Sequence, residues 1–299
     1  MKEVSSVDGI SSPEKNKVEG GTLYLVGTPI GNMADISGRA VKVLKEVDFV
    51  AAEDTRNTGR LLQAIGSDRP MISYFEHNKK SKGEVIAGRL QAGESCALVT
   101  DAGMPGISDP GEDMVRLCAE RGVPVTSVPG PCAAIDALVL SALPAGRFSF
   151  EGFLPTVKSE RAKRLDEVKY DRRTLIFYEA PHRLRETLSA LREALGNRRI
   201  SLCRELTKLN EEIFRSDLDG AVERYAESDP RGEYVLVVDG ASEERPAEDR
   251  WWAGLTVPEH VEGYVSRGAS KNEAIRMTAL DLGLSKNHVY KLVLASDGK

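Results

Sequence analysis

The first half of the sequence repeats one pattern: a short apolar run, a loop rich in glycine or acidic residues, and an amphipathic helix. Apolar runs predict strands at 22–26, 48–52, 70–74, 96–100 and 125–128. Helical patterns lie between them at 37–46, 57–65, 82–91 and 112–121, and Ser37 is a candidate N-cap. Strands and helices that alternate in this way indicate an α/β domain with a mainly parallel sheet.

A second region begins after a break near residues 144–158 that contains four glycines or prolines and is followed by a charged run to residue 173. Apolar runs at 174–178, 199–204 and 233–238 predict further strands, with a helix over 183–195. A long polar segment separates the last two runs. We therefore expect a second α/β domain with a mixed sheet, over 146–240, after a first domain over 21–145.

The two ends of the chain differ from these domains. Residues 1–20 lack the apolar core of a signal peptide, and we expect a disordered lead-in. Residues 241–250 form an acidic, proline-containing linker, and 251–299 predict helices at 258–266, at 270–281 and from 285 to 294. A glycine-containing turn followed by Ser285 as a cap is typical of a helix-turn-helix. A three-helix bundle that only packs on the body is the alternative.

Composition narrows the class of protein. Lys and Arg number 41 and Asp and Glu 46, which gives a net charge of −5 and excludes a uniformly basic nucleic-acid coat but leaves room for a basic groove. No apolar run approaches the roughly 18 residues of a membrane helix. The four cysteines form no CxxC pair and the four histidines no HExxH motif. We therefore expect free thiols, no metal site, no membrane partner and a cytoplasmic location.

Four loops follow predicted strands, and these loops carry the functional signal. In an open α/β sheet, ligands bind outside the carboxyl ends of the strands. Glycine lets the backbone approach a ligand closely, and proline fixes the shape of a loop. GxGxxG and GxxxxGK[ST] motifs are absent, so the loops predict a cleft unlike the usual dinucleotide or P-loop sites. The loops are 27–32, 53–56, 101–111 and 129–133.

These loops and the second region contain motifs that identify a family. In order along the chain, the motifs are VGTPIGN, AAEDTRNTGRLL, VTDAGMPGISDPG, VPGPCAAI, EGFLP, TLIFYEAPHRL, CRELTK and GEYVLVV. Together they resemble the bacterial 16S ribosomal RNA cytidine-2′-O-methyltransferases, a family of the tetrapyrrole-methylase-like class. The resemblance covers about residues 21–240 and the tail. Met104 and Gly106 stand where the family often carries threonine and a larger apolar residue.

The resemblance implies two α/β domains of the tetrapyrrole methylase type with S-adenosylmethionine between them, usually in a homodimer. It implies 2′-O-methylation of a cytidine in the decoding region of 16S ribosomal RNA, within the small ribosomal subunit. It also implies the residues that contact the cofactor: Pro29, Asp101, Gly103, Met104, Ile107, Ser108, Cys132, Ala133, Tyr178 and Leu206. For Asp101, a turn-forming cap is the alternative role.

Methyl transfer to a hydroxyl requires alignment and removal of a proton, and it requires no metal. Glu53, Asp54 and Glu179 are our candidates for accepting that proton or orienting the hydroxyl. Acidic residues in loops also serve as helix caps. Asp54 and Arg56 could equally form an ion pair.

RNA binding requires positive charge, and basic residues gather in three places. Arg56 and Arg204 are candidates to hold phosphates beside the cleft, and the run after the break contributes Lys158, Arg161 and Arg164. Acidic residues are interleaved in that run, so a solvated helix face is the alternative. In the tail, Lys286 opens the last helix, where helix-turn-helix modules usually contact nucleic acid.

Two other functions fit part of these features. A methylase of a tetrapyrrole precursor would share the fold and bind S-adenosylmethionine without methylating RNA. A non-catalytic RNA-binding or assembly protein would not bind S-adenosylmethionine at all.

Overall fold

The computed structural model describes residues 17–109, 111–242 and 251–297, and the chain divides into two compact units, Met1–Ala241 and Ser242–Lys299. Most of the expected lead-in (1–16) and of the expected linker (243–250) lies outside the described residues. Residues 17–20 do not match the expected disorder. The Glu19 amide donates a 2.8 Å hydrogen bond to the Tyr24 hydroxyl, which fixes this stretch beside the first strand.

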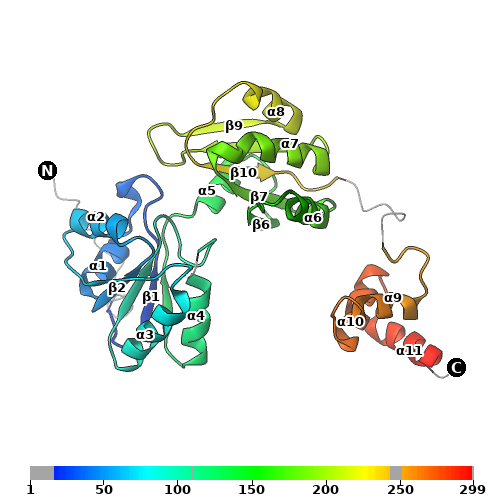
Figure 1. Cartoon of the computed structure of the whole chain (residues 1–299), viewed down its shortest axis with the longest axis horizontal. Coiled ribbons are helices and arrows are strands. Elements are labelled where there is room, and N and C mark those ends of the chain that lie inside the picture. Colours follow the sequence, from blue (N-terminus) through cyan, green and yellow to red (C-terminus); the bar gives the residue numbers. More distant parts are fainter. Residues whose placement is uncertain (1–16, 110, 243–250, 298–299) are drawn as a thin grey trace. The chain divides into compact units, whose positions relative to one another are not determined.

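The first sheet of unit 1 has the strand order β3-β2-β4-β1-β5, and all its strand pairs are parallel. Alternate strand residues form two cores, one under α1 and α2 and the other under α3 and α4, so helices cover both faces (Figure 1). The predicted parallel α/β domain is confirmed. Its strands are β1 (Leu23–Val26), β2 (Phe49–Ala52), β3 (Met71–Ser73), β4 (Cys96–Val99) and β5 (Val125–Val128), and its helices are α1 (Gly38–Glu46), α2 (Thr55–Ile65), α3 (Lys79–Gln91) and α4 (Gly111–Glu120).

Polar caps set where these helices begin. The Ser37 hydroxyl accepts a hydrogen bond from the Ala40 amide at 3.0 Å, which confirms the predicted start of α1. Asp54 caps α2 in the same way through the Arg56 amide, so that helix begins at Thr55, two residues before the predicted start. α3 likewise begins at Lys79 rather than at 82.

The second sheet has the order β6-β7-β10-β8-β9 and is mixed, as predicted. Its β6–β7 pair is parallel, and the three other pairs are antiparallel. Both edge strands were missed from the sequence, β6 because a bulge interrupts it at Gly152 and β9 because its pattern is largely polar. The strands are β6 (Phe148–Phe153), β7 (Thr174–Glu179), β8 (Arg199–Arg204), β9 (Glu212–Asp217) and β10 (Tyr234–Val238).

Helices also cover both faces of the second sheet. One face packs on α6 (Lys158–Val168), α7 (Leu184–Leu195) and α8 (Leu218–Ala226). The other face packs on α5 (Ala133–Leu140), the helix that directly follows β5 of the first sheet. Helix α5 therefore joins the two sheets and carries the end of the β5 loop to the second sheet. A domain boundary at 145–146 stays a prediction.

The C-terminal unit contains α9 (Val257–Val265), α10 (Lys271–Asp281) and α11 (Lys286–Asp297) around a small aliphatic core. Ser270 and Glu273 form a capping box on α10, and the Ser285 hydroxyl accepts from the His288 amide at 3.3 Å. A four-residue turn, 282–285, connects α10 to α11, as in the predicted helix-turn-helix. Among the helices of the described ranges, none is long and apolar enough to cross a membrane.

Candidate active site

A cavity of about 580 Å³ lies in unit 1, and residues from both sheets line it. Its walls come from the loops after β1, β2, β4, β5 and β7 and from the connection between β8 and β9. The loops after β1, β2, β4 and β5 lie at the carboxyl ends of the parallel strands of the first sheet, where α/β proteins bind ligands. The lining includes these predicted cofactor contacts: Asp101, Gly103, Met104, Ile107, Ser108, Cys132, Ala133, Tyr178 and Leu206.

Backbone contacts hold the loops of the first sheet together beneath the cavity. Thr28 and Gly103 form an antiparallel bridge in which each amide donates to the other's carbonyl, at 3.0 and 3.1 Å. Gly103 has a φ of 83°, a conformation that favours glycine. Pro29 follows Thr28 but is not among the described residues that line the cavity, where its neighbour Ile30 is found.

The loop after β4 folds around one carboxylate. Asp109 accepts hydrogen bonds from the amides of Gly106, at 2.7 Å, and Gly111, at 3.0 Å, the second of which opens α4. Ser108 has a φ of 65°, which is uncommon for a residue with a side chain. Such backbone strain gathers at ligand sites because the surrounding contacts impose it. The turn directs Ile107 and Ser108 to the cavity.

Acidic side chains dominate the charge of the cavity. The described lining residues include five carboxylates and one ammonium group, that of Lys208. Burial raises the pKa of Glu53, and the nearby Asp101 adds to this effect. The Asn57 amide group donates to Asp101 at 3.2 Å, which links α2 to the loop after β4. The carboxylates, which are Glu53, Asp101, Asp109, Glu179 and Glu233, favour a cationic ligand.

Apolar and aromatic side chains form the rest of the wall. Tyr178 makes edge-to-face contacts with Phe150 and Phe153, with ring centroids 5.0 and 5.6 Å apart. Burial raises the pKa of Tyr178 to about 12, so its hydroxyl stays protonated at neutral pH. Glu205 and Thr207 have φ values of 51° and 68° and flank Leu206, so a strained turn holds that side chain in the wall. This surface suits a flat apolar group such as a base.

The three predicted catalytic carboxylates have different surroundings. Glu53 lines the cavity. Glu179 also lines it, but its side chain is buried and accepts hydrogen bonds from the Ala180 amide and the Thr187 hydroxyl. Asp54 is absent from the described lining; it caps α2 and pairs with Arg56 at 2.8 Å, the alternative considered above. Glu53 is therefore the candidate whose position best suits proton transfer.

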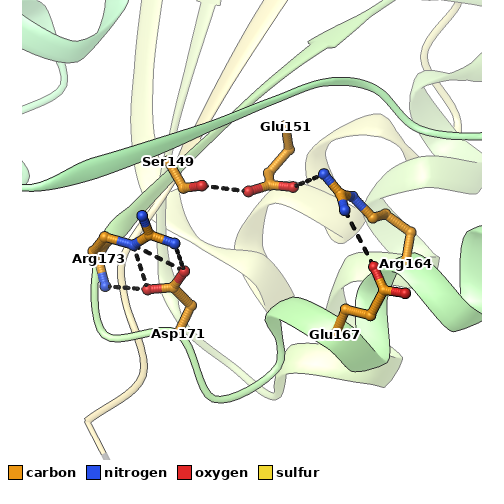
Figure 2. Close-up of polar contacts among 6 residues, drawn as sticks. All are labelled: Ser149, Glu151, Arg164, Glu167, Asp171 and Arg173. Carbon is orange, nitrogen blue, oxygen red and sulfur yellow. Dashed lines mark hydrogen bonds and ion pairs between the residues drawn. The ribbon is translucent and has the colours of Figure 1, made fainter. Parts of the chain in front are cut away.

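The predicted RNA-binding residues do not form one group. Arg161 is only 4% exposed and pairs with Glu186 on α7, so we remove it from the proposed phosphate contacts. Arg164 pairs with Glu151 at 2.8 Å and with Glu167 at 3.1 Å (Figure 2). Of the three basic residues chosen from this run, Arg161 and Arg164 thus have acidic partners, and the buried Arg161 does not fit the alternative of a solvated helix face.

The remaining predicted RNA contacts lie at the surface or at a strand end. Lys158 is exposed on α6, and Arg56 is exposed at the start of α2. Arg204 ends β8 and lines a second, smaller cavity. Lys286 is exposed at the start of α11, in the C-terminal unit.

The lining residues that were not predicted from the sequence include Phe153, Lys208, Glu233 and Tyr234. Lys208 lies in the CRELTK motif, from which only Leu206 and Arg204 were selected. Its stem packs so tightly on Gly31 that a side chain there would collide with it. Its ammonium group pairs with Glu205 at 2.9 Å and Glu233 at 2.7 Å. Over the described parts of the chain, no cluster of His, Cys, Asp and Glu has the arrangement of a metal site.

Comparison with known proteins adds sequence relatives and fold neighbours. The family model for Tetrapyrrole (Corrin/Porphyrin) Methylases matches residues 22–222. Ribosomal RNA small subunit methyltransferase I of Bacillus subtilis strain 168 is 47% identical over 92% of this chain and 94% of its own length. The protein of that name from Escherichia coli O157:H7 is 42% identical over 93% of this chain and 96% of its own length.

The structural neighbours include uroporphyrin-III C-methyltransferase from Thermus thermophilus. It superposes with a TM-score of 0.54 at 19% identity, over 73% of this chain and 94% of that one. A structure of uroporphyrin-III C-methyltransferase from that organism in complex with S-adenosylhomocysteine superposes with a TM-score of 0.52 at 19% identity. The match covers 73% of this chain and 97% of that one. At these identities the likeness supports the fold.

Proposed function

This chain belongs to the tetrapyrrole methylase family and, within it, to the ribosomal RNA small subunit methyltransferase I enzymes, and we propose the reaction as follows. The protein transfers a methyl group from S-adenosylmethionine to the ribose 2′-hydroxyl of a cytidine. The cytidine lies in the decoding region of 16S ribosomal RNA. The substrate is the small ribosomal subunit.

The observation that carries this proposal is the acidic cavity at the strand ends. S-adenosylmethionine bears a sulfonium and an ammonium group against one carboxylate, so its net charge is positive. Five carboxylates in the described lining attract such a ligand. Asp101, whose side chain is steadied by Asn57, is placed to accept hydrogen bonds from its polar groups. Tyr178, Met104 and Leu206 supply the apolar wall for its adenine.

S-adenosylmethionine supplies the electrophilic methyl group when it is bound. The chain's own residues position the ribose and receive the proton. Glu53 is the proposed acceptor of the hydroxyl proton, since its raised pKa makes it a stronger base than an exposed glutamate. The Tyr178 hydroxyl stays protonated and adds no further negative charge to the wall.

The proposed partners follow from the remaining surface. Lys286, at the exposed start of α11, is a proposed contact to ribosomal RNA, together with Lys158, Arg56, Arg164 and Arg204. We also propose a homodimer in the cytoplasm. In its support, α5 leaves Ile135 and Val139 exposed by 42% and 67%, an apolar surface suited to a partner subunit.

Methylation of a tetrapyrrole precursor is the second candidate, favoured by the structural neighbours with TM-scores of 0.52 to 0.54. The higher sequence identity to the ribosomal RNA enzymes favours RNA as the substrate. The ribosomal RNA enzymes match at 42–47% identity over more than nine-tenths of this chain, whereas the tetrapyrrole enzyme matches at 19% identity over 73% of it.

Radiolabelled S-adenosylmethionine tests the three functions together. The protein is incubated with small ribosomal subunits in one reaction and with uroporphyrinogen in another. Label in the ribosomal RNA alone is the expected result. Label in uroporphyrinogen would support the second candidate, and failure to bind the cofactor would support a non-catalytic RNA-binding protein.

A further inference from the structure

A second cavity, of about 380 Å³, lies beside the acidic one at the end of β8. Tyr234 lines both cavities, so one side chain forms part of the boundary between them. Three guanidinium groups, two tyrosines and a serine face the second cavity. These residues are Arg204, Arg224, Arg231, Tyr225, Tyr234 and Ser228.

Two of the guanidinium groups are held in place by the fold. The Nε of Arg204 donates to the carbonyl of Arg231 at 2.8 Å, and one of its Nη atoms lies 3.4 Å from Glu212. Arg224 lies over the ring of Phe214, 4.3 Å from its centroid, and pairs with Glu212. A guanidinium has five N–H donors, so these contacts leave further donors for a ligand.

The charges of the second cavity are not balanced. Glu212 is shared between Arg204 and Arg224. Asp229 lies 3.8 Å from Arg231, and both side chains are at least 80% exposed, so this pair is weak. The described lining therefore carries three cations against two carboxylates. The Ser228 hydroxyl oxygen is also buried, and it has no hydrogen-bond partner within the described chain.

The two neighbouring cavities thus have opposite electrostatic character. Carboxylates outnumber cations by five to one around the first, which attracts a cationic cofactor and repels phosphate. An RNA strand that places a ribose in the first cavity must hold the attached phosphate outside it. Guanidinium groups match the oxygen geometry of phosphate and bind it with paired hydrogen bonds.

We propose that the second cavity binds the phosphodiester adjacent to the methylated ribose. Arg204 and Arg224 hold the phosphate oxygens, and the Ser228 hydroxyl donates to one of them. The inference rests on the proposed function, and it adds Arg224 and Ser228 to the residues that hold the RNA strand.

Substitution of Arg224 in the full-length chain tests this site. Binding of a 16S ribosomal RNA fragment that contains the decoding region is followed by fluorescence anisotropy at several salt concentrations, with S-adenosylhomocysteine present. In Arg224→Gln the RNA affinity should fall about tenfold. The slope of log affinity against log salt should fall by about 0.7, as for one lost phosphate contact on a single strand.

Arg192→Gln is the matched control, because Arg192 is a partly exposed arginine on α7 that pairs with Asp219, and neither residue lines either cavity. Its RNA affinity, salt slope and affinity for S-adenosylhomocysteine should equal those of the wild type. Arg224→Gln should also keep the affinity for S-adenosylhomocysteine. Equal RNA affinity and salt slope in the two variants would overturn the proposal.

Ser228→Asp serves as a second variant that leaves the ion pairs of Glu212 in place. It adds a carboxylate where the phosphate is expected, so it should weaken RNA binding at least as much as Arg224→Gln. If Arg224→Gln melts at a lower temperature than the wild type, its weaker binding could reflect partial unfolding. The RNA affinity and the salt slope of Ser228→Asp then test the proposal instead. Unchanged RNA binding in that variant would overturn the assignment.

These measurements separate the site from the reaction, because neither readout depends on methyl transfer. The proposed function would be refuted if the wild-type protein methylated no RNA, even though Arg224→Gln weakened binding of the fragment as expected. The assignment of the second cavity as a phosphate site would still stand.

Discussion

Gly27 and Gly130 touch through their backbones. A Cβ atom added to Gly27 would lie 2.7 Å from the Cα of Gly130, and one added to Gly130 would lie 2.8 Å from the Cα of Gly27. Real Cβ atoms essentially never come this close to another heavy atom. The loops after β1 and β5 therefore meet in a way that only glycine permits, next to loop residues that line the cavity.

Replacement of Gly130 by alanine should force these loops apart. We expect about 1–3 kcal/mol lower free energy of unfolding, as in other overpacked sites, and weaker cofactor binding. Gly88→Ala is the control, because Gly88 is exposed in α3 and a Cβ added there would meet no heavy atom within 4 Å beyond the adjacent backbone of its own helix. Alanine should therefore stabilise the helix by about 0.5–1 kcal/mol. Chemical denaturation and calorimetry measure both effects. Unchanged cofactor affinity in Gly130→Ala would show that the loop contact does not shape the site.

Removal of the Asp101 carboxylate should weaken the binding of S-adenosylmethionine. A hydrogen bond to a charged group contributes about 1.5–3 kcal/mol, so Asp101→Ala should bind the cofactor roughly ten- to a hundredfold more weakly. Asp68→Ala changes an exposed carboxylate in the α2–β3 connection and should leave the affinity unchanged. Calorimetric titration that finds equal affinities in the two folded variants would remove Asp101 from the site.

The elements that the sequence predicts well are those fixed by local patterns. The parallel strands of the first sheet are short apolar runs, and Ser37 caps α1 through a bond to a residue only three positions away. β6 and β9 depend on longer-range pairing. β6 carries a bulge at Gly152, and β9 finds its place only when β8 is beside it. Such strands lack the alternating apolar pattern that identifies others.

The candidate site shows the same division between local and distant signals. Loop residues such as Asp101 lie within contiguous motifs and were found from them. Lys208 lines the cavity with its stem packed against Gly31 and its ammonium group paired with Glu233, and both partners are far away in the sequence. Arg161 looked like a surface cation, but α6 turns it toward Glu186 on α7. A charged residue on a helix can be buried when a neighbouring helix supplies a residue of opposite charge.

Glu53 should make stability depend on pH. Its pKa in the folded state is raised above 4.5, so between 4.5 and the raised value the folded state binds more protons than the unfolded state. The free energy of unfolding therefore falls as the pH rises through this window. Above the window, the ionised Glu53 destabilises the folded state by its full amount. Glu53→Gln should be more stable than the wild type at neutral pH, and this advantage should disappear below about pH 4.5. Urea unfolding across pH measures the difference.

Glu223→Gln, an exposed change on α8, provides the control for this pH series. It should follow the wild-type curve throughout. A constant difference between Glu53→Gln and the wild type from acidic to neutral pH would contradict the raised pKa. A lower methylation rate in Glu53→Gln, at unchanged cofactor affinity, would agree with its proposed role as proton acceptor.

A chain that ends after Ala241 isolates unit 1 from the helical unit. Because the described lining of the cavity lies entirely before that residue, cofactor affinity should be retained. Methylation of the ribosomal subunit should fall, and it should fall further at high salt because phosphate contacts are screened. Full methylation at every salt concentration would mean that the tail has only a structural role. Lost cofactor binding would mean that the tail supports unit 1.

The position of the new methyl group tests the central claim most directly. Small ribosomal subunits that lack the modification are incubated with the protein and S-adenosylmethionine carrying an isotope-labelled methyl group. The ribosomal RNA is then digested to nucleosides and analysed by mass spectrometry. The account predicts labelled 2′-O-methylcytidine from a decoding-region fragment. Label on a base, on another ribose, or absent from the RNA would contradict it.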